Sequence, residues 1–434
     1  MKLLFNVVSE DTSLSLLIKE LQPETLLVNE NRAPNEATIV KRTFAYTAFI
    51  TELLFNYLTE SDDSYHQMSK SAFSGRPFGY DIFKKVVDAC CEANLITVAT
   101  GKRIDGASVA TTFHLSVSAL DHFDNWLKSQ GNNAHAAFVI LKPSIPLIRA
   151  KYQRPPKIRG VKRPAKEVSL KVLLKREDIK DQWRSLDLLN DFYAKHDLSG
   201  ARFCGLQRIY NNFSQKEPLV GGRLYPIGGS YQTLPSRKRK TLQIDGEPVC
   251  ELDIKSSHLV LYAFIKAATS GKPNVLTETE SPYLSDPYSF DSIPRAVVKA
   301  AITLLIGSGT KSRTWTDEQK VSLLESEGID LNYFKFKDVK DAILERYGFL
   351  LDEDGQDINW AFLQVREADA VYSAVRRLAY EYDVPAYPVH DSIIIKISDK
   401  EVAKTVLRES FESIIGYIPQ ISDCYSNSAA NSID

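Results

Sequence analysis

The sequence predicts an α+β fold in which a mostly helical N-terminal region precedes a mixed C-terminal part. Residues 1 to about 65 have the apolar spacing of helices, whereas Val249–Phe264 and Tyr387–Lys396 begin as short apolar runs suited to buried strands. Each of these two strands is interrupted by an aspartate, Asp253 or Asp391. An ionised carboxylate in an apolar sheet is costly unless it is paired or bound to a cation, so we expect the two aspartates to share a divalent metal.

The composition is that of an ordinary globular protein. The chain has 434 residues, 44% of them hydrophobic and 25% charged, which is enough for about two or three domains. Its formal net charge of -1 argues against a generic nucleic-acid coat, although the distribution of charge matters more than the total. No apolar run approaches the length of a membrane span and no secretory signal is apparent, so we expect an intracellular, cytoplasmic protein without a membrane partner. Five cysteines without a Cys-x-x-Cys pair predict reduced thiols and no structural zinc.

Residues 1–140 are expected to form the helical N-terminal region, with one small module at about 65–116. There a helical stretch, 79–95, leads into two short strands joined by a glycine-flanked tip that carries Lys102 and Arg103. A helix that feeds a β-hairpin with a basic tip resembles a winged helix, a module that usually contacts nucleic acid, and the two cations are then candidate phosphate contacts. A small packing module with a solvated loop fits the same pattern.

Residues 141–184 are expected to be a basic linker that contains prolines. Between Lys142 and Arg176 the chain has twelve lysines and arginines, five prolines and a single acid, Glu167. Such a composition favours an extended, strongly positive segment. It suits a strap for a phosphate backbone, and it also suits a solvated connector.

Residues 185–434 are expected to hold the functional site. A glycine-rich stretch with Arg223 and Tyr225 lets the backbone come close to a phosphate, and the arginine supplies a fork of hydrogen-bond donors. A plain glycine-rich turn is the competing interpretation. A basic run that includes Arg237 and Lys238 follows this stretch.

Two helical segments lie between the two aspartates in the sequence. Pro294 is placed at the start of a helix on which Arg295 and Lys299, four residues apart, put two cations on one face. We call this segment the cation helix. Gln364 lies near the start of an amphipathic helix just before the second strand, and its amide can donate to and accept from groove atoms common to all base pairs. Taken singly, these features also fit a surface pair of cations and an ordinary helix start.

In this order, the first aspartate, the cation helix, the glutamine helix and the His390-Asp391-Ser392 hairpin resemble the palm and fingers of two related groups, the family A DNA polymerases and the single-subunit RNA polymerases of phages and mitochondria. The resemblance implies a right-hand polymerase fold over residues 185–434, with fingers at about 290–365. It also implies two-metal nucleotidyl transfer, in which Asp253 and Asp391 hold two Mg²⁺ ions, for which Mn²⁺ can substitute.

The same resemblance implies roles for the neighbouring side chains. Arg295 and Lys299 would bind the triphosphate of the incoming nucleotide, with Lys299 also a candidate proton donor. His390 would contact the primer-terminal phosphate and complete the catalytic set. Thr303, on the cation helix, is a further candidate for nucleotide binding. The candidates for contact with the template are Arg223, Tyr225, Gln364, Arg237 and Lys238.

The chain departs from the family pattern in two places. The fifth residue after Asp253 is His258, where the DNA polymerases have a glutamate that blocks the sugar 2′-hydroxyl and their RNA-making relatives have a small residue. This histidine is a candidate for nucleotide binding, as a sugar gate or by stacking, and a core histidine with a backbone partner is the alternative. At the end of the cation helix, where the relatives have Tyr-Gly, the chain has Gly307-Ser308.

The sequence therefore predicts a nucleic-acid-templated nucleotidyltransferase, specifically a compact DNA-directed RNA polymerase or primase-like enzyme, with a DNA or RNA template and nucleoside triphosphates as partners. The His-Asp-Ser form of the hairpin favours the RNA polymerases. Three alternatives stay open: a DNA polymerase of the same superfamily, a template-independent nucleotidyltransferase, and a nucleic-acid-binding replication or regulatory protein on a catalytically degenerate scaffold. A metal-dependent nuclease would need a denser carboxylate cluster than the sequence contains.

Overall fold

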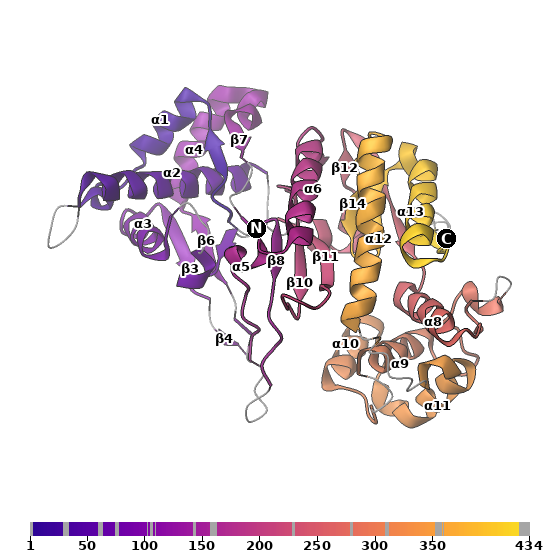
Figure 1. The fold of residues 1–434 in the computed structure, drawn as a ribbon. Coiled ribbons are helices and arrows are strands. Elements are labelled where there is room, and N and C mark those ends of the chain that lie inside the picture. Colours follow the sequence, from indigo (N-terminus) through magenta and orange to yellow (C-terminus); the bar gives the residue numbers. More distant parts are fainter. Residues whose placement is uncertain are drawn as a thin grey trace, which may run out of the picture. The chain divides into compact units, whose positions relative to one another are not determined.

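The computed structural model describes residues 3–28, 34–59, 64–73, 78–101, 103–104, 107–108, 110–141, 145–156, 163–227, 231–277, 281–308, 312–351, 358 and 360–424. Helices and strands are mixed along these residues, which confirms the α+β class expected from the sequence (Figure 1). The chain divides into two compact units, unit 1 with Met1–Leu147, Ala201–Leu206 and Pro226–Leu234, and unit 2 with Ile148–Gly200, Gln207–Tyr225 and Pro235–Asp434. None of the helices in the described ranges combines the length and the apolar character that crossing a membrane requires.

Unit 1 consists of helices packed around a small antiparallel sheet. The sheet has the order β2-β6-β3, built from β2 (Ser64–His66), β6 (Thr111–Leu115) and β3 (Ile96–Ala99). The helices are α1 (Thr12–Glu20), α2 (Glu36–Leu58), α3 (Tyr80–Glu92) and α4 (Val117–Gln130). Two strand pairs complete the unit, β1 (Val7–Ser9) with β7 (Phe138–Ile140) and β4 (Arg103–Ile104) with β5 (Ala107–Ser108). Because α2 is apolar on most of its surface, it forms the centre of the core, as Phe49 and Leu54, both fully buried, show.

A buried ion pair links distant segments of unit 1. Glu52 on α2 is completely buried, and its carboxylate accepts hydrogen bonds from the backbone N–H groups of Leu4 and Phe5. It also accepts from Arg202, whose Nη1 lies 2.6 Å from Glu52 Oε1. A buried carboxylate is tolerated only when its oxygens have such partners, so this network fixes both the N-terminal segment and residues 201–206 against α2.

The segment expected to resemble a winged helix contains α3 followed by β3 and β6, which pair in antiparallel fashion. Lys102 lies outside the described residues, and so does the side chain of Arg103. Their contacts with phosphate therefore stay a prediction.

The central sheet of unit 2 has the order β14-β15-β13-β12-β9, and β16 also pairs with β13. Its strands are β9 (Leu198–Ser199), β12 (Gln243–Ile244), β13 (Glu247–Ile254), β14 (Tyr387–Val389), β15 (Ser392–Lys396) and β16 (Ile421–Asp423). The hairpin expected at 387–396 is thus β14 and β15, and the β-branched side chains of Ile393, Ile394 and Ile395 are fully buried. A strand buried on both faces explains why this run shows no alternation of polar residues.

Two groups of helices accompany this sheet. α12 (Trp360–Glu381) and α13 (Lys400–Ile415) lie side by side and contact the sheet at β14 and β15, and α8 (Ser257–Ser270) packs against α12 (Figure 1). α9 (Arg295–Ser308) packs against α10 (Asp317–Glu327) and α11 (Phe336–Arg346). This second group falls between β13 and β14 in the sequence, so the chain leaves the sheet after the first aspartate and returns before the second.

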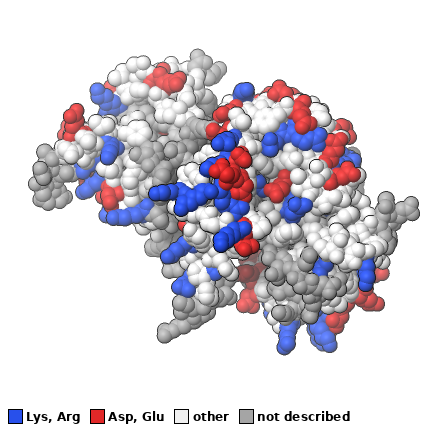
Figure 2. Space-filling model, viewed as in Figure 1, with Lys and Arg blue, Asp and Glu red and all other residues white. Residues whose placement is uncertain are grey.

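A second sheet of unit 2 has the order β11-β10-β8, from β11 (Val220–Pro226), β10 (Leu206–Asn211) and β8 (Ile148–Ala150). It packs with α5 (Leu170–Leu173) and α6 (Glu177–Tyr193), and α7 (Ser236–Arg239) follows later in the chain. The segment 141–184 therefore contains β8, α5 and the beginning of α6. On the face shown in Figure 2, Lys and Arg side chains are interspersed with Asp and Glu. The domain boundaries expected at 140 and 184, and the binding of nucleic acid by the basic segment, stay predictions.

Candidate active site

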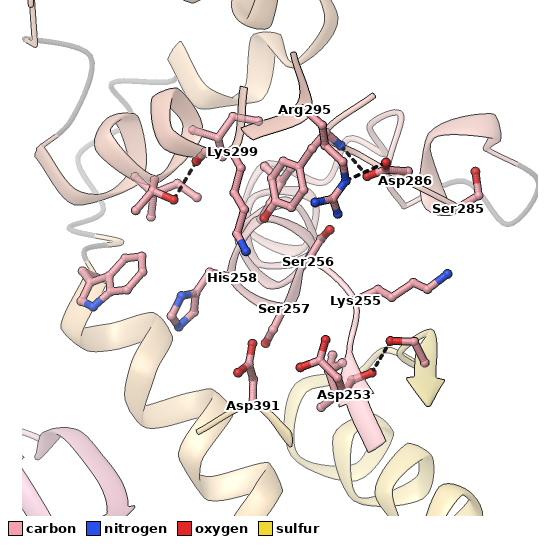
Figure 3. A pocket seen from close by; sticks show the side chains of 18 of the residues that line it. Asp253, Lys255, Ser256, Ser257, His258, Ser285, Asp286, Arg295, Lys299 and Asp391 are labelled. Carbon is pink, nitrogen blue, oxygen red and sulfur yellow. Dashed lines mark hydrogen bonds and ion pairs between the residues drawn. The ribbon is translucent and has the colours of Figure 1, made fainter. Parts of the chain in front are cut away.

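Antiparallel pairing brings the two predicted aspartates together. Asp253, next to last in β13, lies opposite Ser392, the first residue of β15. The backbone N–H of Ile254 donates to the carbonyl oxygen of Asp391 at 3.3 Å. Asp391 follows His390 in the turn between β14 and β15, and His390 has a φ of 59°, the left-handed conformation that a tight hairpin turn needs. Both carboxylates consequently point into one cavity (Figure 3).

The cavity has a volume of about 580 Å³, which is within the range of small-ligand sites. It is formed by the end of β13, the start of α8, one face of α9 and the start of α12. Seven of the predicted site residues line it: Asp253, Asp391, Arg223, His258, Arg295, Lys299 and Thr303.

The electrostatic environment of the cavity disfavours the ionised form of both carboxylates when no cation is bound between them. Burial, followed by the charges of Asp391 and Glu251, raises the pKa of Asp253 to about 7, and the Lys299 ammonium opposes this rise. Burial and then Glu367 raise the pKa of Asp391. Within the described residues, neither carboxylate has a cationic side chain paired with it. A divalent cation between them would remove their repulsion.

The donor set of this pair suits Mg²⁺. Magnesium ions usually keep several waters and bind through one or two carboxylates together with substrate phosphates. Across the described ranges, no group of three or more His, Cys, Asp and Glu side chains is arranged to hold a metal. Asp253 and Asp391 would therefore be the protein's ligands, and water and phosphate oxygens would supply the rest.

Glu251 lies near the pair but already has a cationic partner, Arg239. It stands two residues before Asp253 and so projects from the same face of β13. Arg239 donates to both of its carboxylate oxygens, at 2.9 and 3.0 Å, and the Ser392 hydroxyl donates to Oε1 at 2.8 Å. With these partners and 3% exposure, Glu251 supports the sheet beneath the site.

The cation helix faces the carboxylates across the cavity. Arg295 is the first residue of α9 and Lys299 follows one turn later, so both exposed side chains lie on the cavity face. Figure 3 shows the Lys299 ammonium pointing into the cavity. Arg295 Nε donates to Asp286 at 2.8 Å, and its guanidinium lies 5.3 Å from the centre of the Tyr288 ring. The Thr303 hydroxyl donates to the Lys299 carbonyl oxygen at 2.8 Å, so its own proton is already used.

A fully buried carboxylate that the sequence did not single out organises the wall of the cavity. Glu367 on α12 accepts from Arg223 Nη2 at 2.7 Å through one oxygen and from the Ser257 hydroxyl at 2.7 Å through the other. It therefore joins β11, α8 and α12. The signal available in the sequence was its position between Leu363 and Val371, four residues from each, where it interrupts the apolar stripe of α12.

Both histidines of the site are held neutral near pH 7. Burial, and then the Arg223 charge, lowers the pKa of His258 to about 4, and the same two causes lower the pKa of His390. His258 Nε2 lies 3.2 Å from a Glu367 oxygen and makes no hydrogen bond to it. Because the imidazole is uncharged near pH 7, this contact is not an ion pair at that pH. The His258 ring also lies against Trp360, with 4.2 Å between ring centres.

The other predicted contacts lie outside the cavity lining. The Tyr225 ring packs against His390 edge-on, with 5.9 Å between ring centres. Gln364 is half-buried on the first turns of α12, and Arg237 and Lys238 are exposed on α7. Their contact with a template stays a prediction. The lining residues that the sequence did not single out include Asp286, Tyr288 and Trp360.

Comparison with known proteins adds little to this geometry. No protein-family model matches the chain, and no curated protein matches it. Among solved structures, the chain is weakly similar to the POL domain of Pol1 from M. smegmatis, described in complex with a DNA primer-template and dNTP. The identity is 14% and the TM-score 0.29, over 58% of this chain and 51% of that chain, so the chain spans about half the length of that domain. A TM-score this low supports no inference about function.

Proposed function

We propose that the chain is a nucleotidyltransferase that extends a nucleic-acid strand and that Asp253 and Asp391 bind the divalent metals of the reaction. The observation that supports this most directly is that these two carboxylates and the Arg295 and Lys299 cations line one cavity. A magnesium-bound triphosphate complements this pattern, because its metal meets the carboxylates while its phosphates meet the cations. In this proposal the central sheet of unit 2 is the palm and α9–α11 are the fingers.

Each side chain then has a defined task. Bound metal lowers the pKa of an attacking 3′-hydroxyl and stabilises the charge of the leaving pyrophosphate. Lys299 binds the phosphates and holds a proton at Nζ within reach of the leaving group. Arg295 exchanges Asp286 for a phosphate oxygen. His390, half-buried beside Tyr225 and with a lowered pKa, is placed to contact the strand end, while the Arg223 guanidinium is held in position by Glu367 for the template.

We further propose that the substrates are ribonucleoside triphosphates and that the template is DNA, which is the activity of an RNA polymerase or a primase-like enzyme. Two features of the chain support this choice. The hairpin has the His390-Asp391-Ser392 form of the single-subunit RNA polymerases, and His258 replaces the glutamate with which DNA polymerases block the 2′-hydroxyl. A histidine at this position also adds no carboxylate to the two that Asp253 and Asp391 already contribute to the cavity.

The test is incorporation of labelled NTPs, and separately of dNTPs, on single-stranded DNA with Mg²⁺ or Mn²⁺, with and without an annealed primer. We expect template-dependent RNA synthesis that is lost in the Asp253→Ala/Asp391→Ala double variant and retained in Asp291→Ala, which removes an exposed acid outside the cavity. Incorporation of dNTPs alone would overturn the choice of sugar. Full synthesis by the double variant, or nucleic-acid binding without any synthesis by the wild type, would overturn the proposal and favour a degenerate scaffold.

A further inference from the structure

The cavity has two chemically different regions along α9. The first two turns of the helix present Arg295 and Lys299, opposite the aspartates, whereas the later turns present Ile302 and Ile306. With a rise of about 1.5 Å per residue, Ile306 lies about 10 Å beyond Lys299 along the helix axis. A ligand that fills the whole cavity is therefore polyanionic at one end and apolar at the other.

Besides His258, two aromatic residues of the described ranges line the cavity: Tyr288, whose ring packs against the Arg295 guanidinium, and Trp360 on α12. Trp360 is the first residue of α12, it is half-buried, and it lines the cavity beside His258. The two rings are 4.2 Å apart between centres, inclined at 65°. The low pKa of His258 leaves its imidazole uncharged near pH 7, so neither ring of this pair carries a charge that would attract a phosphate.

The later turns of α9 contribute Ile302 and Ile306 to the cavity, whereas Gly307 after them is exposed and is not among the lining residues. The sequence already indicated that the tyrosine found at this register in the resembling polymerases is missing. No aromatic side chain from α9 itself faces the cavity among the residues that line it.

We infer that Trp360 is the stacking surface for the base of the nucleotide whose triphosphate binds Lys299 and Arg295. The inference rests on the proposed function and adds a base subsite to it. An indole offers the largest planar face among side chains, and every nucleobase has a π-face, so stacking on Trp360 is tolerant of base identity. The site thus recognises that a base is present, and selection among the four bases is left to the template.

The experiment compares the affinities of MgATP and of magnesium tripolyphosphate, which has the phosphates without the base, by titration calorimetry. Trp360→Leu keeps apolar bulk and removes the planar face, Trp360→Phe restores a planar face, and Trp183→Leu is the matched control on α6, outside the cavity. We expect Trp360→Leu to weaken MgATP binding about 5-fold to 150-fold, the range of base stacking on an aromatic side chain. Trp360→Phe recovers most of the affinity, and no tryptophan variant changes tripolyphosphate binding. Lys299→Gln weakens the binding of both ligands.

The outcomes separate this inference from the proposed function. If wild type binds MgATP no more tightly than tripolyphosphate, there is no base subsite and the inference fails while the triphosphate site stands. If Trp360→Leu weakens both ligands equally, Trp360 is only structural and the inference fails. If Trp360→Leu weakens binding of a single-stranded oligonucleotide but not of MgATP, the ring contacts the template and the inference fails. If wild type binds neither ligand, the proposed function itself fails.

Discussion

Replacing Asp253 with asparagine is expected to stabilise the metal-free protein. Folding raises the pKa of this carboxyl group from 3.8 to about 7, so the folded protein binds the proton more tightly than the unfolded chain does. At about pH 8 the group is ionised in both states, and a shift of about three units corresponds to about 4 kcal/mol of lost stability. At about pH 5 the folded state keeps its proton, and the loss falls to about 1.5 kcal/mol. The free energy of unfolding of the wild type therefore falls as the pH rises from about 4 to about 7.

Urea denaturation with a metal chelator, at about pH 8 and about pH 5, measures this effect. Because water in the open cavity screens the carboxylate, we expect Asp253→Asn to exceed the wild type by about 1–4 kcal/mol at the higher pH and by less at the lower one. Asp291→Asn, at an exposed site, should change stability by less than about 0.5 kcal/mol at both. Mg²⁺ or Mn²⁺ should then stabilise the wild type and not Asp253→Asn. A variant less stable than the wild type at the higher pH, or a gap that does not depend on pH, would refute the reasoning.

Glu367→Gln is expected to lower the free energy of unfolding by about 2–4 kcal/mol, because Arg223 then faces no charge in a buried site. Glu381→Gln, at an exposed ion pair on the same helix, should lower it by less than about 1 kcal/mol, and equal losses in urea denaturation would contradict this. Arg202→Met should destabilise unit 1 by about 3 kcal/mol in thermal or urea unfolding. Arg149→Met, which removes an exposed ion pair with Glu167, should have little effect. An Arg202→Met variant as stable as the wild type would count against the buried network. Gly222→Ala should reduce nucleotide incorporation at least about tenfold, because the new Cβ would lie 2.6 Å from Tyr210 Cε1 and displace β11 next to Arg223. Gly246→Ala is the control, because Gly246 has a similar positive φ but open space around it, so its substitution costs only about 1 kcal/mol of backbone strain. Equal activity in the two variants would exclude the clash.

The elements that hold the aspartates could be predicted because each has a strong local pattern. The run Ile393–Ile395 can be buried on both faces only as a strand inside a sheet, and the step from Asp253 into the apolar stretch 257–264 marks a strand followed by a helix. The cation helix was expected from Pro294, and α9 begins at Arg295. These are all short-range signals, which a single sequence carries well.

Long-range partners could not be predicted from the sequence in the same way. Glu367 interrupts the apolar stripe of α12, but its partners Arg223 and Ser257 are identified only by the structure. Trp360 follows a charged stretch and gives no periodic signal of its own, so its place beside His258 depends on how α12 meets α8. Such contacts join residues more than 100 positions apart, as the 110 between Ser257 and Glu367 shows, and no local pattern encodes them.

The network around Glu367 has a consequence for how the molecule is made. Its members come from three segments, with 144 residues between Arg223 and Glu367, and Asp391 follows still later in the chain. A ribosome must therefore add 138 residues after Asp253 before the second carboxylate exists, and until then Arg223 and Asp253 are without these partners. The nascent chain has no assembled cavity in which to bind a ligand, and a chain cut before α12 lacks both the helix that lines the cavity and the β14–β15 pair that completes the sheet. The competence of this site is thus coupled to completion of the whole of unit 2.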